Sequence, residues 1–314
     1  MGWKVLVTAP YMQLVIDRFK PLFDKHDVEL IVPPVEERFE EEDLLQWISE
    51  VDGVICGDDR FTERVLTAAP KLKVLSKWGT GIDSIDQQAC KKLGIAVRNT
   101  PDAFSQPVAD SIMGYILCFA RNLPWMDQAM RKGIWKKIPS RSLSECVLGV
   151  IGVGNVGKAL VRRAVVHGMH VLGNDLMEMP KDFLEETSIE MTSKEELLGQ
   201  SDFVSLNCDL NPTSYHLMNE ARFAQMRDKA IIINTARGSV IKEKALISAL
   251  ETGMLGGAAL DVFEEEPLPD HSPLRKMDNV LLAPHNANSS PEAWERIHES
   301  TICNLLEELE KSSK

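Results

Sequence analysis

Three polar side chains in the second half of the chain lie where apolar runs end. Arg237 follows a run of isoleucines, His285 follows an apolar run and a proline, and Glu266 precedes a proline. A guanidinium is the best two-point partner for a carboxylate, and histidine exchanges protons near neutral pH. Glu266 could orient the histidine ring and favour its protonated form. The set can hold an anion and move a proton, although a surface arginine and a structural histidine are the plainer interpretations.

A glycine pattern, Gly152-x-Gly154-x-x-Gly157, lies between an apolar run at 147–151 and a helical pattern. This layout is typical of a turn that binds the pyrophosphate of a dinucleotide at a helix N-terminus. A second apolar run ends in Asp175, about 20 residues on, where a carboxylate can accept both hydroxyls of the adenosine ribose. Its charge would repel a 2′-phosphate, so the pattern favours NAD over NADP. A solvated carboxylate at a strand end is the alternative for Asp175.

Two further segments carry candidate binding groups. Asp261 is expected inside an apolar strand, where an unpaired carboxylate is costly, so we expect a partner, and a nicotinamide amide is one candidate. Glu264 and Glu265, which follow it, are interpreted as solvated. Ser76-Lys-Trp-Gly-Thr-Gly81 predicts a strand and a glycine-rich turn that can bind an anion through backbone N–H groups. An ordinary turn without a ligand is the alternative there.

Together these groups match the needs of hydride transfer to a 2-oxo acid. A cation must hold the carboxylate and polarise the ketone, an acid must protonate the developing alkoxide, and a third group must orient the acid. Arg237, His285 and Glu266 would fill these roles, and the first domain would supply the second anchor for the substrate.

Composition narrows the classes of partner. The chain has 314 residues, enough for two cores, and a net charge of −12, which argues against nucleic acid. Its six cysteines are scattered without metal-ligand spacing, as in reduced cytosolic proteins. The N-terminus begins directly with a predicted strand and no run is long enough to cross a membrane. We therefore expect a cytoplasmic protein with no metal and no membrane partner.

The order of predicted elements indicates two doubly wound α/β units. Strands are expected at 4–7, 29–32, 53–56, 74–76 and 96–98, with helices at 41–49 and 63–68. A helix at 108–121, apolar all round, is expected to be buried between layers. Strands are then expected at 147–151, 170–175, 189–191, 203–206, 230–234, 258–262 and 280–283. A helix at 291–311 is placed back on the first unit, which gives a substrate domain of residues 1–99 and 287–314 and an NAD-binding domain of residues 100–286.

The motifs in this order resemble those of the D-isomer-specific 2-hydroxyacid dehydrogenases, in the branch that contains D-3-phosphoglycerate dehydrogenase. The matching segments cover essentially the whole chain and are 77–83, 99–101, 108–110, 132–135, 152–157, 234–238, 261–267 and 284–285. The resemblance implies a Rossmann NAD-binding domain inserted in a flavodoxin-like substrate domain, and a homodimer formed through the NAD-binding domains. It also implies a short form without a regulatory C-terminal domain. Trp135 resembles a residue that often reaches the neighbouring subunit.

The resemblance assigns site residues one by one. The catalytic arginine, glutamate and histidine fall on Arg237, Glu266 and His285. Cofactor contacts are expected at Gly152, Gly154, Asn155, Val156, Gly157, Asp175, Cys208, Thr213, Thr235, Ala236, Arg237, Asp261 and His285. Contacts with a small anionic 2-hydroxy or 2-oxo acid are expected at Lys77, Trp78, Gly79, Thr80, Arg237 and His285.

Several residues depart from the family pattern, so the substrate stays open between phosphoglycerate and hydroxypyruvate or glyoxylate types. Lys77 stands where phosphoglycerate enzymes carry arginine, Cys56 where they often have a basic residue, and Trp78 where a small residue is common. Asn286-Ala-Asn288 replaces a glycine-rich segment and could contact the cofactor or narrow the pocket. An NAD(H)-sensing protein similar to the corepressors of this superfamily is the alternative function. A formate-type dehydrogenase would pair its histidine with glutamine instead of Glu266.

Overall fold

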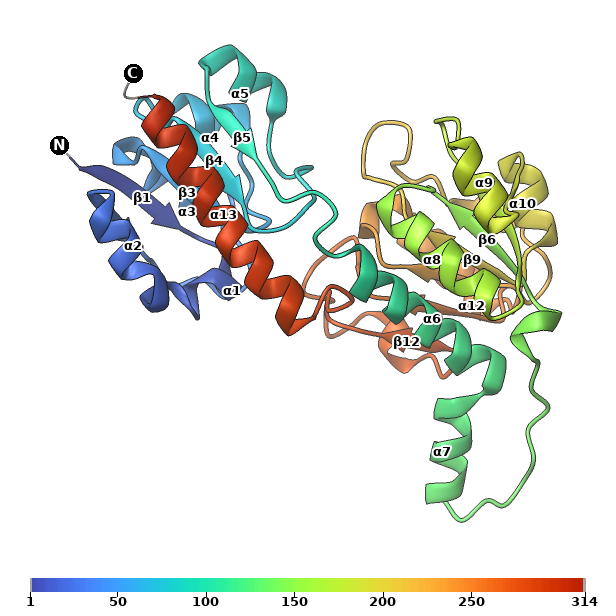
Figure 1. Ribbon diagram of the computed structural model, residues 1–314. Coiled ribbons are helices and arrows are strands. Elements are labelled where there is room, and N and C mark those ends of the chain that lie inside the picture. The colour runs from blue at the N-terminus through green and yellow to red at the C-terminus, as the bar shows by residue number, and fades with distance from the viewer. Residues whose placement is uncertain (1, 313–314) are drawn as a thin grey trace. The chain divides into compact units, whose positions relative to one another are not determined.

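The computed structural model describes residues 2–312, and these divide into two compact units. Unit 1 comprises residues up to Phe104 together with those from Ser290 onward, and unit 2 runs from Ser105 to Ser289. Each unit is a parallel sheet flanked by helices (Figure 1). The predicted α/β class is thus confirmed for both parts of the chain.

Unit 1 has a five-stranded parallel sheet in the order β2-β1-β3-β4-β5, the flavodoxin-like order. Its strands are β1 (Trp3–Val7), β2 (Val28–Ile31), β3 (Gly53–Cys56), β4 (Val74–Lys77) and β5 (Ala96–Arg98). Its helices are α1 (Pro10–Gln13), α2 (Lys20–Lys25), α3 (Glu41–Leu45), α4 (Glu63–Thr67), α5 (Gln87–Leu93) and α13 (Pro291–Lys311), with 3₁₀ turns η1 (Ile16–Phe19) and η2 (Ile48–Glu50). The single helix expected at 41–49 is therefore two shorter elements, α3 and η2.

Helix α13 closes one face of this sheet although it comes from the far end of the sequence (Figure 1). The Ser290 side chain caps its first turn by accepting from the Ala293 N–H, and Pro291 starts the helix. The helix lies so close to β3 that a Cβ on Gly53 would be 2.9 Å from Leu305. The Ser76 hydroxyl of β4 donates to the Thr301 carbonyl at 2.7 Å. Packing and this buried bond fix the helix along the strand that ends in the predicted anion-binding turn.

Unit 2 has a seven-stranded parallel sheet in the order β12-β11-β10-β9-β6-β7-β8. Counted from β6, this is the 3-2-1-4-5-6 order of the dinucleotide-binding fold with one strand added. The strands are β6 (Val147–Ile151), β7 (His170–Asn174), β8 (Glu190–Met191), β9 (Phe203–Leu206), β10 (Ile231–Asn234), β11 (Gly257–Leu260) and β12 (Val280–Leu282). Apolar side chains of these strands and of α10 and α12 form its core.

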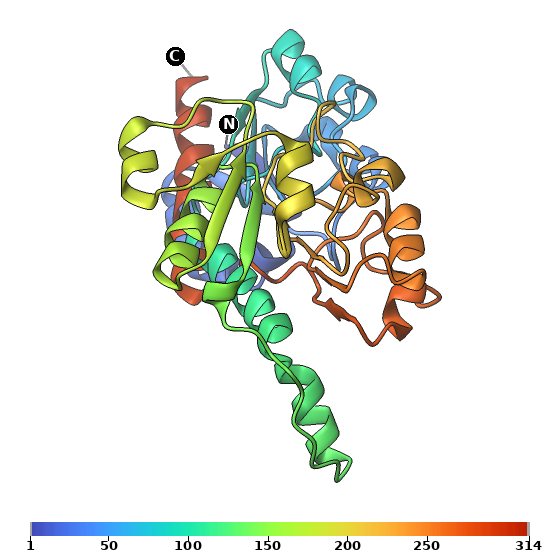
Figure 2. The same cartoon turned by 90° about the vertical axis from the view of Figure 1, so that its right-hand side faces the viewer.

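The helices of unit 2 are α6 (Ser105–Arg121), α7 (Leu123–Arg131), α8 (Asn155–Val166), α9 (Lys181–Thr187), α10 (Lys194–Gln200), α11 (Glu220–Phe223) and α12 (Glu243–Glu251), with 3₁₀ turns η3 (Leu143–Glu145), η4 (Gly238–Val240) and η5 (Pro273–Lys276). Helix α7 and the segment after it extend away from the sheet of unit 2 (Figure 2).

Two sequence-based expectations for unit 2 were wrong. Helix α6 is not buried all round, because Gln106, Asp110, Gly114 and Arg121 form an exposed stripe, on which Asp110 pairs with Arg163 of α8 at 2.6 Å. Asp261 does not lie inside a strand, because β11 ends at Leu260. The chain turns at Asp261, whose carboxylate accepts hydrogen bonds from the following loop.

Candidate active site

The three glycines of the nucleotide turn in unit 2 have different surroundings, and close backbone contacts require glycine at two of them. Gly152 has a φ of +88°, and a Cβ there would lie 2.7 Å from the Asn207 backbone. A Cβ on Gly157 would lie 2.2 Å from the Gly152 carbonyl, so helix and strand pack in direct backbone contact. Gly154 has open space where its Cβ would be, and it caps α8, whose first-turn N–H groups lack intrahelical partners. The turn therefore offers an approachable helix N-terminus to an anion.

Asp175, directly after β7, is bonded to this turn. Its Oδ2 accepts from the Val153 N–H at 2.6 Å, and its Oδ1 accepts from the Met177 N–H at 2.8 Å. A carboxylate oxygen has two lone pairs, so each can still accept from a ribose hydroxyl. The carboxylate thus both positions the glycine turn and presents negative charge beside it, and the sequence predicted only the second role.

Cys208 and Thr213 lie in the segment that follows β9. Burial raises the pKa of the Cys208 thiol to about 11, so it stays uncharged at neutral pH. The N–H and hydroxyl of Thr213 both donate to Asn211 Oδ1, at 2.8 and 2.7 Å. Because the Thr213 hydroxyl already donates its one hydrogen to Asn211, it can interact with a ligand only by accepting a hydrogen bond.

The turn that carries Arg237 is braced by the last residue of β10. Asn234 Oδ1 accepts from the Ala236 N–H at 3.1 Å, and Asn234 Nδ2 donates to the Arg237 carbonyl at 2.9 Å. A Cβ on Gly238 would lie only 1.8 Å from the Phe263 carbonyl oxygen, so this turn touches the backbone that follows β11. The Arg237 guanidinium donates to the Ala236 carbonyl at 2.8 Å. Asn234 lies in the segment 234–238 that matches the family motifs, but the sequence alone does not predict that its side chain holds this turn.

The Thr235 hydroxyl in the same turn is a buried polar atom for which the described residues provide no hydrogen-bond partner. Such a group normally has one. Together with the open Gly154 and the Asp175 carboxylate, it fits a polar cofactor that extends from the glycine turn across the carboxyl ends of the strands.

His285 and Glu266 form the hydrogen-bonded pair expected from the sequence. His285 Nδ1 lies 2.9 Å from Glu266 Oε2, and Glu266 Oε1 accepts from the Phe263 N–H at 2.9 Å. The side chains are 24% and 19% exposed, respectively, so water only partly screens the interaction between them. A carboxylate is an acceptor, so Nδ1 carries a proton, and exchange of a proton with a ligand falls to Nε2.

Asp261 holds the loop on which His285 lies. Its two oxygens accept from the N–H groups of Asn286 and Ala287, each at 2.8 Å, and its carbonyl accepts from the His285 N–H at 2.8 Å. Burial raises the pKa of the Asp261 carboxyl, and the two backbone bonds act in the opposite direction. His285 itself has a φ of +51°, a conformation that this bracing maintains. The expected partner of Asp261 is thus partly the protein backbone, and its contact with a nicotinamide stays a prediction.

In unit 1, the predicted anion-binding turn follows β4. Gly79 has a φ of +130°, and the described residues provide no hydrogen-bond partner for the N–H groups of Gly79 and Thr80. Trp78 differs, because its N–H donates to the Cys56 carbonyl at 2.8 Å and its indole packs inside the unit. The Thr80 hydroxyl donates to the Thr100 carbonyl at 3.0 Å. Two consecutive N–H groups are therefore available to an anion.

Lys77 does not present an uncompensated charge at this turn. Its ammonium is buried and lies 2.6 Å from Asp58 Oδ1. This pair cannot be recognised in the sequence, because Asp58 lies 19 residues earlier and follows a different strand.

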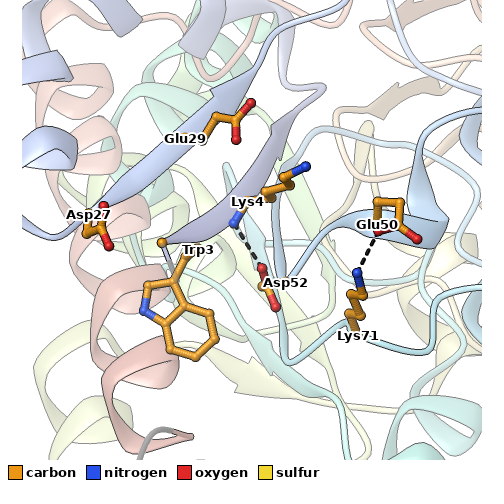
Figure 3. A pocket seen from close by; sticks show the side chains of 8 residues that line it. Trp3, Lys4, Asp27, Glu29, Glu50, Asp52 and Lys71 are labelled. Carbon is orange, nitrogen blue, oxygen red and sulfur yellow. Dashed lines mark hydrogen bonds and ion pairs between the residues drawn. The ribbon is translucent and has the colours of Figure 1, made fainter.

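A separate hollow of about 570 Å³ opens at the amino ends of the strands of unit 1 (Figure 3). Its lining includes the ion pair Lys71–Glu50 at 2.6 Å, and the Lys4 N–H donates to Asp52 at 2.9 Å. Ligands of open α/β sheets bind at the carboxyl ends of the strands, so this hollow is distinct from the candidate site.

Among residues 2–312 we find no helix long and apolar enough to cross a membrane, and no group of acidic, cysteine and histidine side chains that could hold a metal.

Comparison with known proteins gives a consistent set of matches. Residues 113–287 match the family model described as "D-isomer specific 2-hydroxyacid dehydrogenase, NAD binding domain". The chain is 39% identical to a D-3-phosphoglycerate dehydrogenase of Methanocaldococcus jannaschii over 294 residues, which are 92% of this chain and 54% of that protein. It is also 39% identical to a glyoxylate reductase of Korarchaeum cryptofilum over 270 residues, 84% of this chain and 81% of that one.

A solved structure agrees over nearly the full length of both chains. The D-lactate dehydrogenase from Aquifex aeolicus, complexed with NAD and lactic acid, aligns with a TM-score of 0.86 at 26% identity and covers 98% of each chain. The chain thus spans about half the length of the phosphoglycerate relative but nearly the whole of this structural neighbour.

Proposed function

The chain belongs to the D-isomer-specific 2-hydroxyacid dehydrogenase family, and on that premise we propose that it interconverts a D-2-hydroxy acid and its 2-oxo acid with NAD. The observation that carries the proposal is the His285–Glu266 pair at 2.9 Å, on strand-end loops of the same sheet as the dinucleotide turn. An alternative role as an NAD(H)-sensing corepressor is not favoured, because the relatives are named as dehydrogenases and reductases.

NAD is the cofactor of the proposed reaction, and its nicotinamide supplies or accepts the hydride when it is bound. We assign the pyrophosphate to the turn at Gly152 to Gly157 and the ribose hydroxyls to Asp175, whose charge disfavours a 2′-phosphate. The unpartnered Thr235 hydroxyl and the Asp261 carboxylate are further assigned to the cofactor. The remaining assigned contacts are Asn155, Val156, Cys208, Thr213, Ala236, Arg237 and His285.

The chain's own residues do the acid–base work. In the direction of reduction, His285 donates the Nε2 proton to the oxygen of the developing alkoxide, and Glu266 holds the Nδ1 proton and stabilises the charged ring. Arg237 holds the substrate carboxylate and polarises the ketone. In the reverse direction, neutral His285 accepts the hydroxyl proton.

Unit 1 is assigned the second anchor for the substrate. The N–H groups of Gly79 and Thr80 can each donate to a carboxylate oxygen. Because Lys77 is neutralised by Asp58, and because burial raises the pKa of the Cys56 thiol so that it stays uncharged, we propose a small substrate without a phosphate group. Glyoxylate and hydroxypyruvate are substrates of this kind.

We also propose a cytoplasmic homodimer formed through unit 2. Large apolar side chains are exposed on α7 and the segment after it, where Trp135 is 88% exposed, and an isolated monomer rarely leaves such a surface uncovered. Leu123 and Met130 of α7 and Ile134 after it are also exposed. All six cysteines are free thiols, as expected in a reducing compartment.

The proposed reaction is tested by NADH oxidation against glyoxylate, hydroxypyruvate, pyruvate and phosphohydroxypyruvate. We expect turnover with the first two and a kcat/KM at least about tenfold lower with the phosphorylated acid, since the turn offers it no uncompensated cation. Absence of turnover with every acid, in a protein that binds NADH, would refute the enzymatic role. Preference for phosphohydroxypyruvate would refute the substrate class alone.

A further inference from the structure

The first residue of the proposed substrate turn is tied to the C-terminal helix by a hydrogen bond within unit 1. The Trp78 indole Nε1 lies 3.0 Å from Nδ1 of His298, which is on α13. Trp78 is 6% exposed and His298 is 3% exposed, so water does not compete for this bond. The two residues are 220 positions apart in the sequence.

The direction of this bond fixes the state of the histidine. An indole N–H is a donor only, so His298 Nδ1 must accept, and the ring must be neutral with its proton on Nε2. Burial lowers the pKa of His298, which favours this neutral form. The charged groups around the ring are Glu295 on the same helix and Arg18 of η1, which are paired at 2.6 Å and act on the ring in opposite directions.

Aromatic packing restricts the indole further. Trp78 stacks on Tyr11 with ring centres 5.3 Å apart, and it also contacts Phe104, Trp294 and His298 at 5.7 to 5.9 Å. Aromatic pairs are stable both offset-stacked and edge-to-face, so ring packing alone allows the indole more than one orientation. The hydrogen bond to His298 selects one orientation of the indole. Gly79 and Thr80 follow Trp78 directly and are also bonded to Thr100, so the indole bond restrains the turn from its other side.

We propose that His298 is a positioning residue for substrate binding: by accepting from the Trp78 indole, it aims the N–H groups of Gly79 and Thr80 at the substrate carboxylate. This role rests on the proposed function of the turn. His298 lies on a helix assigned no part in the reaction, and its effect is on binding and not on proton transfer. Its loss should therefore raise KM for the 2-oxo acid and leave kcat and NADH binding nearly unchanged.

Three variants test the hydrogen bond. His298→Leu removes the acceptor, Trp78→Phe removes the donor but keeps a ring, and His298→Asn retains an acceptor at the position of Nδ1. We expect His298→Leu and Trp78→Phe each to raise KM for glyoxylate and hydroxypyruvate about 5- to 30-fold, the effect of one buried hydrogen bond. His298→Asn should restore KM to within about threefold of the wild-type value, and the Leu and Phe changes together should cost little more than either alone.

Leu305→Ala is the matched control. This residue lies two turns further along α13 and faces Gly53, so its truncation loosens the helix without removing the bond to Trp78. We expect it to lower Tm while KM stays within about twofold. If Leu305→Ala raises KM as much as His298→Leu does, the effect is general loosening of α13 and the positioning role is refuted.

Hydrogen exchange of the peptide that contains residues 78–81 separates this proposal from the proposed reaction, because it needs no turnover. Faster exchange in His298→Leu and wild-type exchange in His298→Asn would support the positioning role even if no 2-oxo acid were reduced. Unchanged exchange and unchanged KM in both His298→Leu and Trp78→Phe would overturn it while leaving the reaction intact. If His298→Leu does not fold, Trp78→Phe and His298→Asn decide the outcome.

Discussion

The turn that carries Arg237 and the turn that carries Trp78 both follow parallel strands, but different interactions hold them. In unit 2 the backbone is held directly, because Asn234 bonds two main-chain groups and Gly238 contacts the Phe263 carbonyl. In unit 1 backbone bonds also hold the turn, from the Trp78 N–H to the Cys56 carbonyl and from the Thr100 N–H to the Gly79 carbonyl. Here, however, a side chain of the turn itself, the Trp78 indole, adds a bond to a distant element through His298 on α13. The first arrangement suits groups that must meet a reacting atom within a fraction of an ångström, and the second suits a contact that only binds.

This difference predicts a division of kinetic effects between the two units. Changes in unit 2 should lower kcat, and changes in unit 1 should raise KM. Each of the following experiments either sharpens that division or breaks it.

Replacing His285 with alanine should have the largest effect. We expect kcat for reduction of glyoxylate to fall by about 10²–10⁴, because the proton donor is lost. NADH binding, measured by fluorescence titration, should change by less than about threefold. His271→Ala, an exposed histidine in the same unit, is the control and should retain activity within twofold. If His285→Ala keeps most of its turnover, unit 2 does not contain the acid and the division fails.

Gly238→Ala tests whether direct backbone contact holds the catalytic turn. A Cβ would lie 1.8 Å from the Phe263 carbonyl oxygen, so the two loops must separate. We expect a loss of at least about 3 kcal/mol in the free energy of unfolding, seen as a fall of roughly 5–10 °C in apparent Tm.

Gly114→Ala is the matched control, because a Cβ on that exposed residue of α6 has no neighbour within 4 Å. Glycine costs a helix about 0.5–1 kcal/mol, so this change should raise Tm slightly. Equal Tm values for the two variants would show that the contact at Gly238 can relax.

The sequence predicted much of unit 2 because its signals are local. The three glycines, Asp175 and the proline beside Glu266 are each recognisable within a few residues, and strand order follows from alternating strands and helices. The hydrogen bonds that hold the catalytic loops, made by Asn234 and Asp261, are not predictable in this way. The apolar run predicts Asp261 inside a strand although β11 ends at Leu260, because such a run does not show where strand pairing ends.

The side-chain contacts in unit 1 are even harder to predict from the sequence. Nothing near Lys77 in the sequence indicates Asp58, and nothing near Trp78 indicates His298, since these pairs form only when separate elements pack. A tryptophan in a glycine-rich turn suggested an effect on substrate size, whereas the structure buries its indole among other aromatic rings. Side-chain positioning across 220 residues leaves no periodic pattern to detect.

Asp175→Asn gives a smaller effect and separates the two roles of this residue. Asparagine has a single acceptor oxygen, which can keep the bond from the Val153 N–H while the bond from the Met177 N–H is lost. The glycine turn should therefore keep its shape, and Tm should stay within about 2 °C. Loss of the charge removes repulsion of a 2′-phosphate, so we expect the preference for NADH over NADPH, as a ratio of kcat/KM, to fall about 10- to 100-fold. Comparable use of both cofactors by the wild-type protein would contradict the assignment of Asp175 to the ribose. A large fall in Tm would show that bracing of the turn depends on the full carboxylate.

The smallest expected effect is a pH dependence that belongs to unit 1. Burial lowers the pKa of His298 in the folded state below its usual value of 6.5, so over the interval between the two values the unfolded chain binds more protons than the folded one. Stability should therefore rise with pH through this interval and be lost as pH falls below about 6.5. Protonation of the folded protein places a proton on Nδ1, which opposes the Trp78 N–H. Because burial lowers the pKa of His298 in the folded state, KM for glyoxylate should rise only at a more acid pH than the one at which stability begins to fall. In His298→Asn nothing titrates at this position, and we expect its apparent Tm to fall less than the wild-type Tm between pH 7.5 and pH 5.5, with a difference on the order of 1–3 °C.

His271→Asn serves as the control for removal of a histidine from the surface. If wild type and His298→Asn lose stability in parallel while KM rises equally in both, the acid sensitivity does not arise at His298, and the bond between Trp78 and His298 does not account for the pH dependence of substrate binding.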